Sequence, residues 1–260
     1  MSRFKPSFIR YIAPLLMPVI LLGGYTLFAH WQNNLFFPSI ARIWAAFKQT
    51  WNPHGLRVEA WPSLANLMIG YPAGLFGALI LGILIARLRA VRVASEPIIA
   101  FFLALPSVAI VPIFIVLFGP GPGTKQLIIG QAVFFQVLVN VIDGLGSLDP
   151  TLAQSADLFK IRGFRRLFLV DLPGAGSQIL AGARAGLSLG VLVMIVSELF
   201  NTRYGIGVVT LSAQSNFDFP TMWAGMVFTA IIGIGLNGLF SLAERPYLRR
   251  AGLLQTTTEG

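Results

Sequence analysis

Apolar residues in this chain of 260 residues gather in long runs, which short polar or charged stretches separate. Crossing the hydrocarbon core of a bilayer as a helix takes roughly 20 mainly apolar residues. Six runs meet this requirement, at about residues 11–29, 62–86, 97–118, 125–146, 179–200 and 221–243. The pattern therefore predicts an all-α integral membrane protein with six transmembrane helices.

The first run follows three basic residues, Arg3, Lys5 and Arg10. A basic start and an apolar run also describe a secretory signal peptide. This run is long for such a signal and lacks a clean small-residue cleavage site. The pattern therefore favours a membrane anchor that the protein retains.

Residues 36–51, with the sequence FFPSIARIWAAFKQTW, are too polar and too few to span a bilayer. Within them Ile40, Ile43, Trp44 and Phe47 recur at helical spacing. This spacing predicts an amphipathic helix that lies in the membrane interface.

The composition also indicates a membrane protein, because 55% of the residues are hydrophobic, only 11% are charged and the mean hydropathy is +0.76. Soluble domains carry about 25% charged residues, so lipid has to cover much of this chain. The formal charge of +9 matches the Lys and Arg excess that membrane proteins keep on the cytoplasmic side, and we expect no nucleic-acid partner. The chain has no cysteine, and its two histidines have no partner at ligand spacing, so we expect no metal site.

Most of the 19 basic residues fall on one side if the N-terminus is cytoplasmic. This distribution predicts that both termini, and the loop between the fourth and fifth runs, are cytoplasmic. The chain then divides into an N-terminal tail and first helix (1–35), an external amphipathic segment (36–60), a five-helix core (61–245) whose cytoplasmic loop covers 147–178, and a C-terminal tail (246–260).

Small residues and prolines interrupt the apolar runs. Gly182, Gly186 and Gly190 lie four residues apart on one face of the fifth helix, which allows a neighbouring backbone to approach closely. Such a row indicates helix packing, or alternatively a smooth face on which helices slide as a gate. Pro106 and Pro112 remove backbone hydrogen bonds in the third run, so they act either as a hinge or as a simple bend.

Polar residues within the predicted spans are few, and each is costly unless it is satisfied. Glu198 lies near the outer end of the fifth helix, and Gln136, Asn140 and Asp143 share one face of the fourth. The fourth-helix residues predict either a seam of hydrogen bonds between helices or the lining of a solute path. We place Gln136, Asn140 and Glu198 on the candidate path.

Catalytic motifs are missing from the sequence, so no catalytic residue is expected. The segment GPGPGTK (119–125) lacks the spacing of a phosphate-binding loop and reads as a tight turn. If ATP drives this protein, another chain has to hydrolyse it.

Residues 153–173, AQSADLFKIRGFRRLFLVDLP, form the one charged interlude in the apolar middle of the chain. Leu152, Ala156 and Phe159 fall on one face of a helix, and Gly163 allows a turn into a second segment. The pattern predicts a helical hairpin with an apolar knob and a basic rim. Such a hairpin suits either a groove on a soluble partner or a surface of anionic lipid headgroups.

The same loop resembles the cytoplasmic signature of ATP-binding-cassette importer permeases in the nitrate, sulfonate and taurine branch. That signature runs E-A-A, three residues, G, about nine residues, an apolar pair and L-P. Counting back from the closing Leu172 and Pro173 places Gln154, Ser155 and Ala156 at E-A-A and Lys160 at the glycine. Only Ala156 and the closing pair match strictly, and Gly163 is expected to supply the displaced turn. The segments FPSIARIWAAF, LPSVAIVPIFIVLFGPG and VSELFNTRYGIGVVTLSAQSNFD extend the resemblance over nearly the whole chain beyond the first span.

The resemblance implies a type I importer (MetI-like) permease fold in a bacterial inner or plasma membrane. It implies a second permease subunit, identical or different, two cytoplasmic ATPases that bind ATP and Mg, and an external solute-binding protein. This chain would hold no cofactor of its own. The loop would contact the ATPase through a set of coupling residues: Gln154, Ser155, Ala156, Asp157, Phe159, Lys160, Arg162, Gly163, Leu172 and Pro173.

The implied function is the import of a small solute by alternating access, the solute being a small anion, an organic acid or a sulfonate-like compound. The alternative is a channel or membrane scaffold that works without ATP. A channel requires a continuous polar stripe through several spans, and only the fourth helix offers one.

Overall fold

The computed structural model describes residues 6–32, 34–200 and 202–250, and its regular structure in these ranges is helical throughout. The longer helices are α1 (Pro6–Gln32), α4 (Trp61–Arg87), α5 (Arg89–Ala104), α7 (Pro122–Gly146), α10 (Leu172–Glu198) and α12 (Phe219–Arg250). The shorter ones are α2 (Ile40–Thr50), α3 (Pro53–Gly55), α6 (Val111–Phe118), α8 (Pro150–Leu158), α9 (Gly163–Arg166) and α11 (Ile206–Ser215). The predicted all-α class is confirmed.

Four helical stretches of the described residues are long and apolar enough to cross a membrane, namely Pro53–Arg87, Pro122–Gly146, Gly163–Glu198 and Phe219–Tyr247. They correspond to the second, fourth, fifth and sixth predicted spans, of which the fifth (179–200) runs two residues past Glu198. Two of them are longer than α4 and α10 because π-helical turns at Leu56–Ala60 and Leu167–Asp171 join those helices to α3 and α9. The first predicted span falls within α1.

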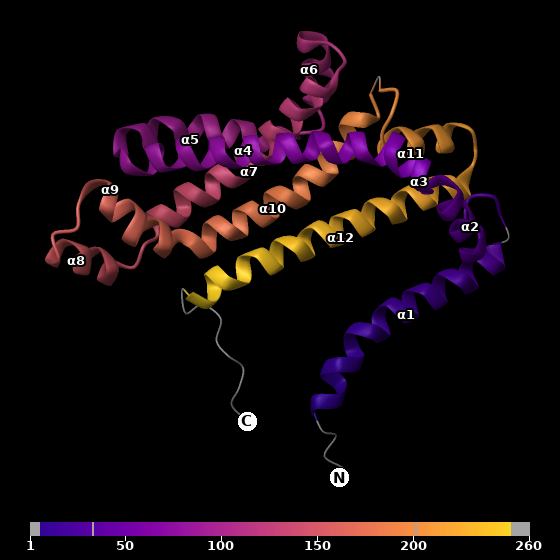
Figure 1. Ribbon diagram of the computed structural model, residues 1–260, viewed down its shortest axis with the longest axis horizontal. Coiled ribbons are helices and arrows are strands. Elements are labelled where there is room, and N and C mark those ends of the chain that lie inside the picture. Colours follow the sequence, from indigo (N-terminus) through magenta and orange to yellow (C-terminus); the bar gives the residue numbers. More distant parts are fainter. Residues whose placement is uncertain (1–5, 33, 201, 251–260) are drawn as a thin grey trace.

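The third predicted span, 97–118, is not one helix. Helix α5 ends at Ala104, and Leu105 is extended (φ −75°, ψ 121°). The cause is Pro106, whose ring disfavours helical backbone in the residue before it. Pro112 lies in the first turn of α6, where its missing N–H costs no hydrogen bond. The prolines therefore separate two helices, and Figure 1 shows α6 projecting away from the direction of α5.

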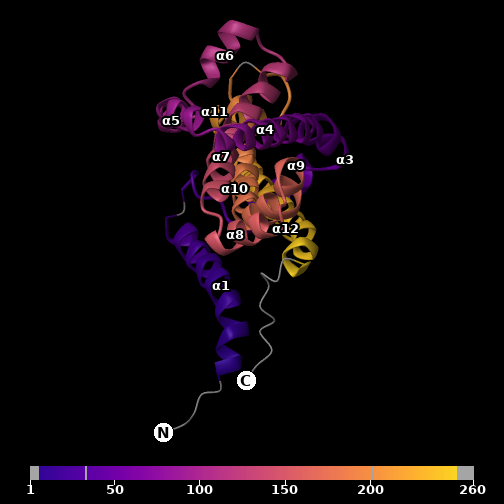
Figure 2. The same ribbon diagram turned by 90° about the vertical axis from the view of Figure 1, so that its left-hand side faces the viewer.

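Helices α4, α7 and α10 form the centre of the bundle, as both views show (Figures 1 and 2). Helix α7 has eleven buried residues, including Ile129, Val133 and Val137. Glycines let α4 approach it closely. A Cβ atom added to Gly70 would lie 2.7 Å from the Gln126 carbonyl oxygen, and one on Gly74 would overlap the Gly130 carbonyl oxygen.

The predicted glycine row on α10 also lies at a helix contact. Gly182 faces Asn140 of α7, Gly186 faces Val137, and Gly190 faces both α7 and α4. These contacts agree with the packing interpretation of the row. The sliding-gate interpretation stays a prediction.

The two ends of the bundle carry different short helices. Helices α8 and α9 lie at one end, and α2, α3 and α11 lie at the other (Figure 1). The predicted amphipathic helix is α2, and it is followed by Trp51, which stacks on Phe228 of α12 with ring centroids 4.1 Å apart. Helix α1 diverges from the bundle, and near its end the Tyr25 hydroxyl donates to the Pro38 carbonyl oxygen (2.8 Å).

Candidate functional site

The candidate site begins with the hairpin of α8 and α9, residues 150–166, between α7 and α10. Asp149 starts α8 because its side chain accepts a hydrogen bond from the Thr151 backbone N–H (2.8 Å), and Pro150 follows in the first turn. The same hydrogen bond lowers the pKa of the Asp149 carboxyl below its ordinary value. The helix is therefore capped by an acid that stays ionised at neutral pH.

The turn between α8 and α9 uses two residues in the left-handed backbone region, Lys160 (φ 54°) and Gly163 (φ 63°). Lys160 occupies the glycine position of the importer signature. Left-handed backbone favours glycine because it has no Cβ, so Lys160 adopts a conformation that is uncommon for a residue with a side chain. Gly163 also supplies a turn, as the sequence predicted, and α9 begins there.

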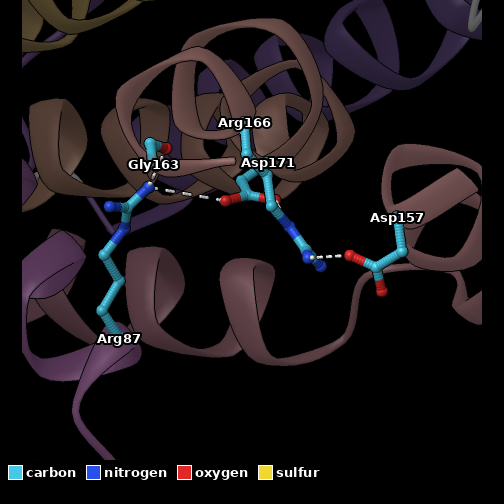
Figure 3. A network of polar contacts seen from close by, with 5 residues as sticks. All are labelled: Arg87, Asp157, Gly163, Arg166 and Asp171. Atoms are coloured by element: carbon cyan, nitrogen blue, oxygen red, sulfur yellow. Dashed lines mark hydrogen bonds and ion pairs between the residues drawn. The ribbon is translucent and has the colours of Figure 1, made fainter. Parts of the chain in front are cut away.

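A network of charged groups ties the hairpin to the bundle (Figure 3). Arg166 of α9 donates to Asp157 of α8 through Nη1 (3.0 Å) and to Asp171 through Nε (3.4 Å). Arg87, at the end of α4, donates to the Gly163 carbonyl oxygen (3.3 Å) and lies 3.7 Å from Asp171. Asp171 thus holds both arginines, with only 15% of its side chain exposed.

The π-helical turn at Leu167–Asp171 lies between the hairpin and α10. A π turn inserts an extra residue into a helix and changes the face on which the preceding residues point. Here the inserted turn ends at Asp171, the centre of the network. The sequence indicated Asp157 but not Arg87, Arg166 or Asp171 as site residues. Arg87 lies far from the hairpin in the sequence, and charge alone did not distinguish Arg166 and Asp171 from the other charged residues of 153–173.

The predicted apolar face of the hairpin is only partly exposed. Ala156 is buried (2% exposed), whereas Phe159 is 78% exposed, so these two do not share one outward face. The exposed apolar surface instead includes Leu158 and Phe164, which the sequence did not single out. The turn after α8 causes this difference, because helical spacing no longer applies beyond Leu158. Of the other predicted coupling residues, those exposed are Gln154, Asp157, Lys160, Arg162, Gly163 and Pro173, while Ser155 and Leu172 are half-buried.

The three predicted path residues do not meet in this structure. Asn140 packs on Gly182, and its side-chain oxygen accepts from Gln178 of α10 (3.3 Å). This is the bond between helices that the seam interpretation predicts. Gln136 lies one turn away and accepts from Asn140 through its carbonyl oxygen (2.8 Å). Glu198 is about four turns farther along α10.

Glu198 anchors the turn into α11 at the end of the bundle opposite the hairpin. Its side chain is 1% exposed, and its Oε2 accepts from the Gly207 backbone N–H (2.9 Å). Gly205 (φ 148°) lies directly on the carboxylate, because an added Cβ would be 2.6 Å from the Glu198 Cδ. The two preceding backbone N–H groups donate to side chains near the start of α4. The Gly205 N–H donates to the Glu59 carboxylate (2.9 Å), and the Ile206 N–H donates to the Ser63 hydroxyl oxygen (3.1 Å).

We expect Glu198→Ala to lower the stability of the purified protein by about 1–3 kcal/mol, because the buried Gly207 N–H loses its acceptor. The Glu198→Gln protein should lose much less stability, since the amide oxygen still accepts the hydrogen bond from Gly207. Thermal unfolding in detergent, followed for both variants, measures the difference. Equal losses in the two variants would contradict this anchoring role.

Residues 78–250 match the family described as "binding-protein-dependent transport system inner membrane component". The chain belongs to this family. Membership confirms the resemblance to importer permeases, and it identifies a multi-pass membrane protein that is a transport subunit and not an enzyme.

Several relatives share most of the permease. SsuC of Bacillus subtilis (strain 168), provisionally named as an aliphatic sulfonates transport permease, is 26% identical over 95% of this chain and 91% of its own. The taurine transport system permease TauC of Escherichia coli (strain K12) is 29% identical over 82% of this chain and 80% of its own. The riboflavin transport system permease RibX of Chloroflexus aurantiacus is 29% identical over 63% and 61%. The sequence relatives therefore include the sulfonate and taurine branch.

A solved structure shares the fold. A chain of the methionine ABC transporter MetNI, in an inward-facing conformation, superposes with a TM-score of 0.61 over 74% of this chain and 94% of its own, at 17% identity. The predicted MetI-like permease fold is confirmed at this level.

Proposed function

We propose that this permease carries a small organic anion of the sulfonate class inward, and that a separate cytoplasmic ATPase drives it through the α8–α9 hairpin. The observation that carries the proposal is the hairpin itself. It presents exposed Leu158, Phe159 and Phe164 beside basic Lys160 and Arg162, which suits a groove on a soluble protein. A hairpin that only touched lipid headgroups would not need the connection to α4 that Arg87 makes through Gly163 and Asp171.

The charge network gives the hairpin a mechanical connection to the spans. Arg87 is the last residue of α4, and Asp171 precedes the first residue of α10, so both helices are tied to α9 through Arg166 and Gly163. A displacement of the hairpin by a partner would therefore be passed to two central helices at once. Such a rigid-body movement would shift the permease between its two states of access.

The assembly that we propose contains two permease subunits, two ATPases and an external solute-binding protein. ATP and Mg would be bound by the ATPases, and this chain would hold no cofactor. The basic residues of the hairpin support a cytoplasmic position for the hairpin and for both termini in this proposal. Helix α1 is largely exposed along its described side chains and diverges from the bundle, which leaves it available to lipid or to the second permease subunit.

The sulfonate class is supported by the names of TauC and SsuC. A passive channel or scaffold is not favoured, because Asn140 is engaged by α10 and the predicted path residues form no continuous polar stripe.

The test is whether an ATPase stays with the permease after one exposed aromatic side chain is replaced. We expect Phe159→Glu to reduce the amount of co-purified ATPase by about tenfold or more, because a charge would have to be buried in an apolar groove. Phe217→Glu is the matched control, since Phe217 is 67% exposed and lies near the opposite end of the bundle. Ala156 is a poorer test, because its replacement would disturb the hairpin from within.

Equal co-purification from the Phe159→Glu and Phe217→Glu proteins would contradict the assignment of the hairpin to the ATPase. Recovery of the unmodified chain without any ATPase would contradict the importer itself.

A further inference from the structure

A cavity lies at the end of the bundle opposite the hairpin. Its volume is about 750 Å³, within the range of small-molecule sites. Three separate regions line it, namely the first turns of α4, the link between α6 and α7 together with the first turns of α7, and the loop between α10 and α11. Neither the hairpin nor the contact of Asn140 with Gln178 and Gly182 contributes to it.

Two cationic side chains from different segments line this cavity, Lys125 of α7 and Arg203 of the α10–α11 loop. Within the ranges that the structure describes, neither forms an ion pair. Lys125 is half-buried, so its ammonium group has lost part of its hydration. The wall of the cavity contains no acidic residue.

Two acidic residues close to this region, Glu59 and Glu198, bind backbone groups. Glu59 and Glu198 accept hydrogen bonds from the backbone N–H groups of Gly205 and Gly207. Glu198 is close enough to attract Lys125, but it is buried behind the cavity and does not line it. The acids therefore fix the loop that carries Arg203, while the cations remain on the cavity surface.

The rest of the wall combines amide groups with flat apolar surfaces. The Gln126 amide donates to the Asn66 side-chain oxygen (3.2 Å), which leaves the Asn66 amide nitrogen and the Gln126 oxygen for other partners. Trp61 and Tyr204 add aromatic faces that are 60% and 53% exposed. Beside them Gly121 caps α7 with no side chain, and the space next to it is open, so a ligand can come close to the backbone.

We infer that this cavity binds a small organic anion, with its sulfonate or carboxylate group between Lys125 and Arg203 and its short apolar part against Trp61 and Tyr204. The inference deepens the proposed function, because the bound anion would be the transported solute at the outer end of the permease. Two cations on a wall that carries no acidic residue disfavour amines and metal cations. The aromatic walls favour an organic anion over an inorganic one.

The test uses the full-length permease in phosphatidylcholine nanodiscs, without any partner. Titration calorimetry with 1-butanesulfonate, 1-butanol and butylammonium compares an anion, a neutral molecule and a cation of one chain length. We expect binding of the sulfonate alone. Lys125→Gln and Arg203→Gln should each weaken it by about tenfold or more, the effect of losing one charge-assisted hydrogen bond.

Two control variants separate a specific site from general charge. Lys125→Arg should retain most of the affinity, because it keeps a cationic donor. Arg57→Gln removes the same charge from an exposed residue near α4 that does not line the cavity, so it should have little effect. An equal loss of affinity for butanesulfonate in the Arg57→Gln and Arg203→Gln proteins would overturn the site. Unchanged affinity in both the Lys125→Gln and Arg203→Gln proteins would overturn it as well.

Anionic lipid is the other source of the same chemistry. Repeating the titration with phosphatidylglycerol in the nanodiscs should leave the affinity for butanesulfonate nearly unchanged. If the lipid abolishes that binding, the cavity is a headgroup site and the inference is wrong. If sulfonate binds as expected but cells with the permease and its ATPase do not import it, the cavity is an anion-binding site and the proposed transport function is wrong.

Discussion

Replacement of Gly74 by valine is expected to prevent assembly of the helix bundle. A Cβ at this position would overlap the Gly130 carbonyl oxygen of α7 and lie 3.0 Å from the Val133 Cβ. Backbone atoms cannot rotate away as a flexible side chain can, so α4 and α7 would have to separate. Overpacking costs about 1–3 kcal/mol where side chains yield, and we expect a larger cost here.

Gly235→Val is the matched control for this prediction. Gly235 lies within α12, and apart from its chain neighbours and the nearby backbone of the same helix no described atom lies within 4 Å of a Cβ placed there. Both variants add the same side chain to a membrane-spanning helix. We expect the Gly235 variant to give monodisperse protein in detergent at the normal yield, and the Gly74 variant to aggregate or to be degraded. Similar yields and unfolding temperatures would show that the α4–α7 contact is less tight than described.

Hydropathy predicted the long helices well because each must be apolar over a fixed length to cross the bilayer. The pattern failed at 97–118, where the run is apolar throughout but Pro106 makes helical backbone unfavourable at Leu105. Hydropathy measures the preference of side chains for lipid, and it does not register a backbone break. The same limit concealed the π-helical turns, which leave the apolar pattern of α4 and α10 unchanged.

The hairpin was predictable as a segment, but its exposed surface was not. Charge and a glycine indicated a turn near Gly163, whereas the left-handed backbone of Lys160 (φ 54°) was not predicted, because the sequence placed the turn at Gly163 alone. Helical spacing then grouped Ala156 with Phe159, although the helix ends between them, at Leu158. Which residues lie outward depended on where α8 stops, and its sequence carries no strong signal for that point.

Contacts between distant segments were the part that sequence patterns could not supply. Asp171 meets Arg87 only because α4 and α10 bring their ends to the same side of the bundle. In the same way, the linear sequence does not pair Lys125 with Arg203, and the fold places both on one cavity. Single charges in short loops have many possible partners, so only the packing of the long helices selects among them.

Within the proposed importer, Asp171→Asn is expected to reduce transport per ATP hydrolysed by about tenfold, while the ATPase stays bound. The substitution keeps the shape of the side chain but removes the charge that holds both Arg87 and Arg166. The hydrogen bond from Arg166 to Asp171 joins two charged groups, a class of bond that contributes about 1.5–3 kcal/mol, and the ion pair with Arg87 would be lost with it, so the connection between the hairpin and the two central helices would be weakened. The exposed surface that would meet the ATPase would remain intact.

Asp157→Asn provides the comparison, because Asp157 also contacts Arg166 but is 66% exposed and holds no residue of α4 or α10. Exposed ion pairs contribute roughly 0–1 kcal/mol, so this variant should couple almost normally. Proteoliposomes that contain the permease and its ATPase allow transport and ATP hydrolysis to be measured on one sample. Equal coupling in the two variants would mean that the hairpin acts on the spans through the continuous helix of α9 and α10, without the link to α4. A loss of bound ATPase from the Asp171→Asn protein would instead show that the network shapes the docking surface.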